Sequence, residues 1–89
     1  MQTPEPVTIV VNQRSYIYSV NPFVLTNALG FVRAVLKEYT ITGTNGDTYK
    51  LYKTTERNWY DVVNANPAAD KALLRLLKLE IDYLEKAIP

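Results

Sequence analysis

The chain of 89 residues contains neither cysteine nor histidine. Without cysteine it can form no disulfide, no thiolate nucleophile and no zinc or iron–sulfur site built on thiolates. Without histidine it lacks the commonest metal ligand and the commonest general base near neutral pH. A Ser-His-Asp or Cys-His site therefore cannot be built from this chain. We expect no catalytic, cofactor-binding or metal-binding residues, and we predict that the protein is not an enzyme.

Strong charge of one sign and long apolar runs are also missing. Ten Lys and Arg against nine Asp and Glu give a net charge of +1, which makes nucleic acid an unlikely partner because no basic field gathers phosphates. No apolar run approaches the roughly 20 residues that cross a bilayer. Residues 1–6 hold two prolines and no basic-then-apolar signal, so we expect an extended N-terminal leader and a cytoplasmic location.

The composition is that of an ordinary folded domain. Hydrophobic residues make up 47% and charged residues 21% of the chain, close to average globular values. A length of 89 residues suits one hydrophobic core and is too short for two. We therefore predict a single domain over residues 7–89.

Two β-hairpins are the clearest local features. Residues 7–11 are mostly β-branched, and residues 15–20 alternate between apolar and polar beyond a turn at Asn12. Asn45-Gly46 separates two further β-rich runs, and both of these residues tolerate the positive φ that a tight hairpin needs. We place Ile41 opposite Leu51 in this second hairpin. Together the hairpins predict an antiparallel sheet of about four strands.

Residues 21–38 allow two interpretations. Asn21-Pro22 has the chemistry of a helix start, and residues 22–38 are amphipathic at helical spacing, so one long helix is possible. Gly30 opposes it, because glycine costs a helix interior about 1 kcal/mol relative to alanine. A helix here would also leave part of the second hairpin unpaired. The favoured interpretation is a short helix or loop over 21–30, followed by a strand from about Phe31.

A C-terminal helix is predicted from Asn66-Pro67 to about Ala87, with its apolar side packed across one face of the sheet. The fold class is thus α+β, in the order β-β-(short helix or loop)-β-β-α. The predicted core combines the inner residues of the strands with one stripe of this helix: Ile9, Val11, Tyr18, Val35, Ile41, Leu51, Trp59, Leu73, Leu77, Ile81 and Leu84.

The same helix carries a second apolar stripe, which contains Leu76, Leu79, Tyr83 and Ala87. A helix lying on one sheet needs an apolar arc of only about 100° or somewhat more. Either residues 21–38 or the region of Trp59 covers the second stripe, or it is an interface. Our leading hypothesis is a non-catalytic interaction module, a homodimer or a binder of another protein, that self-associates through this helix.

Two alternatives stay open. The chain has seven tyrosines, and aromatic rings on an open sheet can stack on bases or sugars. This suggests a weak single-stranded nucleic-acid or carbohydrate binder, although cross-strand packing in a half-buried sheet explains the same residues. The other alternative is an accessory subunit of a larger complex. No feature of the sequence identifies a small-molecule ligand.

Overall fold

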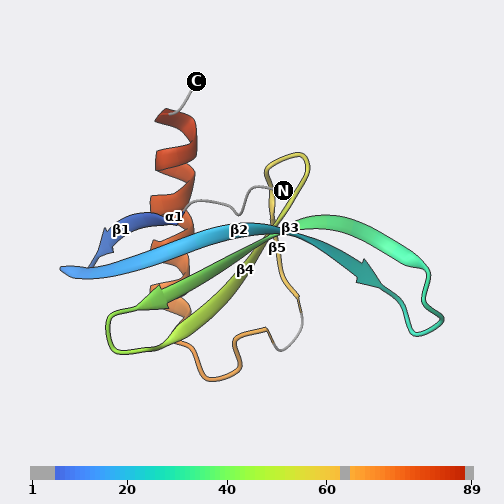
Figure 1. Ribbon diagram of the computed structural model, residues 1–89, viewed down its shortest axis with the longest axis horizontal. Helices are drawn as coiled ribbons and strands as arrows, with labels where there is room; N and C mark the ends of the chain where they lie inside the picture. The colour runs from blue at the N-terminus through green and yellow to red at the C-terminus, as the bar shows by residue number, and fades with distance from the viewer. Residues whose placement is uncertain (1–5, 63–64, 88–89) are drawn as a thin grey trace.

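The computed structural model describes residues 6–62 and 65–87 and confirms the α+β prediction. Five antiparallel strands form one sheet in chain order, and a single helix lies across one face (Figure 1). The short fifth strand was not predicted. The elements are β1 (Val7–Val11), β2 (Arg14–Thr26), β3 (Val32–Gly43), β4 (Thr48–Thr54), β5 (Trp59–Tyr60) and α1 (Lys71–Ala87). Residues 1–5 of the expected leader lie outside the described residues.

Both predicted hairpins are present. The β1–β2 turn places Asn12 and Gln13 at φ values of 52° and 63°, as a two-residue turn of the primed kind requires. The β3–β4 loop closes with Gly46 at a φ of 90°. The predicted register was wrong, because Leu51 lies opposite Tyr39 and not opposite Ile41. A shift of two residues keeps each side chain on its face, so the inner residues were still identified correctly.

Residues 21–26 are strand, and both the long helix and the short helical segment are wrong. β2 continues through Pro22, which pairs with Lys37 of β3. β1 begins at Val7, opposite Tyr18, and within the described residues no strand pairs with the far edge of β2 beyond that point. An edge without a partner strand tolerates a residue without an N–H. The strand that was expected from about Phe31 is present as β3.

The turn between β2 and β3 explains why the helical pattern fails. The backbone N–H groups of Leu29 and Phe31 donate to the Asn27 side-chain oxygen, at 2.9 and 3.0 Å. Gly30 adopts a φ of 86°, a conformation that stops regular structure and favours glycine. These two residues form a local turn, which lets β3 return along β2.

The helix starts later than predicted. α1 begins at Lys71 and is capped by Asp70, whose carboxylate accepts from the Ala72 N–H at 2.9 Å. Asn66 instead binds the backbone of Lys50 on β4, accepting from its N–H at 2.8 Å and donating to its carbonyl at 2.7 Å. β5 pairs only with Tyr52 and Lys53. The Asn66 side chain therefore binds the backbone N–H and C=O groups of β4 where β5 does not reach the edge of that strand.

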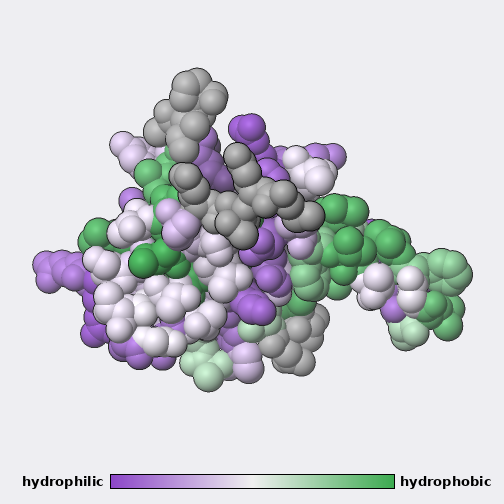
Figure 2. Space-filling model, in the orientation of Figure 1, coloured by the Kyte–Doolittle hydropathy of each residue, from purple (hydrophilic) through white to green (hydrophobic). Residues whose placement is uncertain are grey.

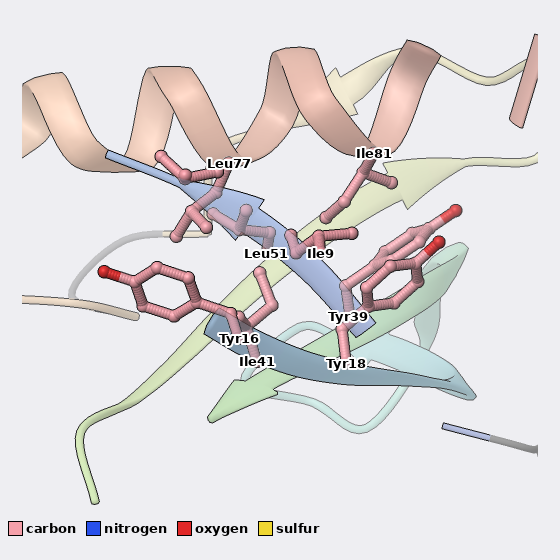
Figure 3. Packing of buried hydrophobic residues seen from close by; sticks show 9 residues of the cluster. Ile9, Tyr16, Tyr18, Tyr39, Ile41, Leu51, Leu77 and Ile81 are labelled. Atoms are coloured by element: carbon pink, nitrogen blue, oxygen red, sulfur yellow. The ribbon is translucent and has the colours of Figure 1, made fainter. Parts of the chain in front are cut away.

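The core lies between α1 and the sheet (Figure 3). Leu77 and Ile81 of α1 are fully buried against inner residues of the strands, as are most of the predicted residues, while Trp59, Leu73 and Leu84 pack at its border. Val35 is the error, since half of its surface is exposed. Tyr16 and Tyr39 are buried here but were missed. On the opposite face, Leu36 and Tyr52 are buried, and the Phe23 ring lies 4.9 Å from that of Tyr52.

Candidate functional site

The predicted interface residues of α1 lie on its outer side. Leu76, Leu79 and Tyr83, here called the outer stripe, are 38%, 59% and 71% exposed. The Ala87 side chain lies outside the described residues. Residues 21–38 lie along β2 and β3, and the indole of Trp59 donates to Asp82 at 2.8 Å. Neither region covers the outer stripe within the described part of the chain.

A second apolar surface, which the sequence analysis missed, lies on the β2–β3 hairpin. β1 ends opposite Tyr18, and β4 reaches only Leu36 of β3. Residues 19–35 therefore form a two-stranded ribbon, here called the arm, which projects to the right of the sheet (Figure 1). Figure 2 shows hydrophobic residues gathered on it. Its exposed large apolar residues are Val24, Leu29, Phe31, Val32 and Val35.

The arm continues the sheet face that α1 covers. Val20 lies opposite Tyr39, and four residues further out Val24 lies opposite Val35. Directly opposed residues share a face, and every second residue along a strand returns to it. Tyr39 is buried beneath the helix, whereas Val24 and Val35 are 51% and 52% exposed. The helix therefore covers only part of one continuous apolar face.

A buried ion cluster sets the rotation of α1 on the sheet. Lys53 of β4 is 2% exposed and forms salt bridges with Asp82, at 2.5 Å, and Glu85. Its ammonium lies 4.4 Å from the centre of the Trp59 ring, and the Tyr39 hydroxyl donates to Glu85 at 2.6 Å. Two carboxylates from one side of α1 are thereby tied to the sheet, so the outer stripe faces away from the core.

The cluster also shifts proton equilibria. Burial raises the pKa of Tyr39, and its hydrogen bond to Glu85 raises it further. Outside this cluster, on the opposite face of the sheet, burial and a hydrogen bond to Glu38 raise the pKa of Tyr52 to about 12. Burial alone would raise the pKa of Asp82, but hydrogen bonds from Lys53 and Trp59 hold it below its usual value. Asp82 therefore stabilises the fold at pH values above the pKa that its carboxyl has in the unfolded chain. This contribution is lost as the pH falls through the lower pKa of the folded state.

We expect the domain to lose stability in alkali as pH rises above about 10, the pKa of an unperturbed tyrosine. Below that pH, Tyr39 is protonated in both states, so its contribution is fully present. Above it, the unfolded chain releases the proton while the folded chain retains it, and folding becomes less favourable. Urea unfolding followed by circular dichroism at increasing pH should show this loss of stability, and Tyr39→Phe should flatten the pH dependence. Ionisation of Tyr39 in a chain that stays equally stable would contradict this expectation.

The five tyrosines of β2, β3 and β4 do not form an open stacking platform. Tyr16, Tyr18, Tyr39 and Tyr52 are buried, and Tyr49 packs against the core. Stacking on a base or sugar needs an accessible ring face, which these residues offer only if the core opens. These rings therefore give no support to the hypothesis that the chain binds nucleic acid or carbohydrate.

Carboxylates could serve as general acid and base, but four acidic side chains of the strands and loops lie apart from one another. Glu38 accepts from the Tyr52 hydroxyl at 2.9 Å, and Asp47 accepts from Asn45 at 2.8 Å. Asp61 lies 3.7 Å from Lys78, beside an open groove of about 660 Å³ between β4, β5 and the start of α1. Glu56 is exposed in the turn before β5. These positions offer no pair of carboxylates for general acid and base work.

Within residues 6–62 and 65–87, no group of three or more acidic residues is placed to hold a metal ion. The one helix in this part of the chain is too short and too polar to cross a membrane. The outer stripe and the arm remain as candidate interaction surfaces of the described residues. No family model, curated protein or solved structure matches the chain.

Proposed function

We propose that this chain is a non-catalytic interaction module that forms a homodimer through the outer stripe of α1. The observation that carries the proposal is the exposure of Leu79 and Tyr83, 59% and 71%, on a helix whose opposite side is fully buried. Apolar surface in water costs roughly 25 cal/mol per Å² relative to burial. Large exposed apolar side chains grouped on one element are typical of interaction sites.

The outer stripe is not needed to complete the core. Leu77 and Ile81 already fill the space above the sheet, with 0% exposure. Turning α1 so that Leu79 faces inward would pull Asp82 and Glu85 away from Lys53, leaving a buried charge without partners, which is costly. These contacts support the proposal that a second chain covers the stripe, since such a contact leaves the fold undisturbed.

Leu79→Glu is expected to give a folded monomer, because it places a charge in the centre of the interface without touching the core. Light scattering over a wide concentration range should show a dimer for the natural sequence and half that mass for the variant. Circular dichroism should be unchanged. Thr55→Glu, which adds the same charge at an exposed turn position, is the matched control and should remain a dimer.

Three other outcomes count against this proposal. A Leu79→Glu variant that keeps the dimer mass would refute the interface, and an unfolded variant would place Leu79 in the core. A natural chain that stays monomeric throughout would leave the accessory-subunit alternative, tested by a co-purifying partner.

The cytoplasmic location stays a prediction, which localisation of a tagged chain would test.

A further inference from the structure

We propose that the outer stripe of one copy docks on the arm of a second copy, and that the second copy returns the same contact. This proposal rests on the proposed function and names the surface that receives the helix. The occupant of the arm is thus α1 of an identical chain. The resulting dimer has a two-fold axis, with two equal stripe-to-arm contacts.

The arm needs a cover of this kind. A two-stranded ribbon is only marginally stable alone in water, and beyond Tyr18 and Leu36 neither β1 nor β4 supports it. On the body of the sheet, the same face is covered by the inner side of α1. A second copy offers another apolar helix surface, the outer stripe, for the part of that face left bare.

The outer stripe fits within the length of the arm. The β2 half of the arm, residues 19–26, extends about 26 Å at 3.3 Å per residue. Leu76 and Tyr83, at the two ends of the outer stripe, are seven residues apart on α1, which is about 10 Å at 1.5 Å per residue. The arm is therefore long enough to receive the whole stripe.

The open edges of the arm are a poorer docking site than its face. Partners that add to a sheet edge need a row of free N–H and C=O groups. Pro22 interrupts the open edge of β2, because proline has no N–H to donate. On β3, only residues 32–35 extend beyond β4. These features protect the edges, whereas the face carries the Val24 and Val35 pair.

The charges of the two surfaces are complementary. The arm carries Arg33, and Lys37 at its base lies two residues from Val35, on the same face. Glu80 lies on the helix between Leu76 and Tyr83, four residues from one and three from the other. Among the described residues, Arg33, Lys37 and Glu80 have no ion-pair partner within 4 Å. Docking brings Glu80 of each copy toward the basic residues of the other.

Apolar side chains are exposed on both elements. Val24 and Val35, which share the docking face of the arm, are 51% and 52% exposed, and Leu79 and Tyr83 of the outer stripe are 59% and 71% exposed. Leu29, Phe31 and Val32 add apolar surface at the end of the arm. Stripe-to-arm contact covers both surfaces, whereas contact between two outer stripes would leave the arm bare.

Disulfide trapping tests the contact directly, because the chain has no cysteine of its own. Val35→Cys and Leu79→Cys variants, both at exposed positions, are mixed, allowed to exchange subunits and oxidised mildly. We expect a disulfide-linked dimer that joins one chain of each kind, at least about tenfold more abundant than with Thr55→Cys in place of Val35→Cys. Peptide mapping identifies the linked pair.

The outcomes separate this proposal from the proposed function. Linkage of Leu79→Cys to itself, without the mixed product, would keep the helix interface but overturn docking on the arm. A monomeric natural chain would overturn both. Assembly beyond two copies would overturn the reciprocal geometry, since contacts that do not close form longer chains.

Charge exchange gives a second test that does not depend on cysteine. Lys37→Glu should weaken the dimer roughly tenfold, because two opposed pairs each change from attraction to repulsion. Glu80→Lys in the same chain should restore most of the affinity, while Glu56→Lys, the same charge change at an exposed turn position, should not. A double variant no tighter than Lys37→Glu alone would overturn this orientation of the helix on the arm.

Discussion

Leu77→Asp is expected to unfold the domain. Leu77 lies at the centre of α1 with 0% exposure, in contact with the strand residues of the core (Figure 3). The substitution removes a buried leucine and places a carboxylate where it has no water and no partner, which costs at least about 4 kcal/mol. A domain of this length is stable by only about 4–13 kcal/mol. Circular dichroism and urea unfolding should show a chain that is largely unfolded or close to it.

Leu79→Asp is the matched control, since it makes the same change two residues along the same helix. Leu79 is 59% exposed, so the new carboxylate stays in water and the domain should remain folded. The difference between the two variants measures which side of α1 faces the sheet. A folded Leu77→Asp chain, or equal loss of stability in both variants, would mean that the helix orientation is wrong.

Lys53→Met is expected to cost about 3 kcal/mol of stability, near the low end for a broken buried ion pair, because the partner carboxylates still reach water. Methionine fills most of the space of the lysine side chain, so the loss comes from charge. Asp82 and Glu85 would face each other without the ammonium that now bridges them, and the contact of that ammonium with the Trp59 ring would also be lost.

Neutralising the carboxylates separates charge from packing. In a chain that already carries Asp82→Asn and Glu85→Gln, Lys53→Met should cost much less than in the natural chain, because no unpaired negative charge remains. Urea unfolding of the four variants completes the cycle. Equal costs in both backgrounds would show that Lys53 acts through packing alone. Acid should act in the same direction, since protonation of Asp82 removes its part of the ion pair.

Local patterns in the sequence were enough to predict both hairpins, the C-terminal helix and its two apolar stripes. Asn45-Gly46 predicts a turn wherever the rest of the chain lies, because its backbone conformation is local. The stripe that contains Leu77 and the one that contains Leu79 follow from helical spacing alone. These features depend on residues close in the chain, and the α+β class follows from them.

Three features of the structure depend on residues far apart in the chain. Residues 21–26 are amphipathic at helical spacing, yet pairing with β3 makes them strand. A lysine in a strand is normally expected to face solvent. Lys53 instead lies beside Glu85, which is 32 positions away in the chain. Val35 has the pattern of a core residue, but it lies beyond the helix and is half exposed.

The sequence by itself therefore determined the two hairpins, the C-terminal helix and which of their sides are apolar, but not the strand formed by residues 21–26. Only the tertiary structure decided which apolar sides are covered, because coverage depends on where one element ends relative to another. α1 covers the sheet over Tyr39 but not over Val24, so the arm is bare. Hydrophobic burial has no preferred direction, and local spacing cannot distinguish a side that faces the core from one that stays exposed.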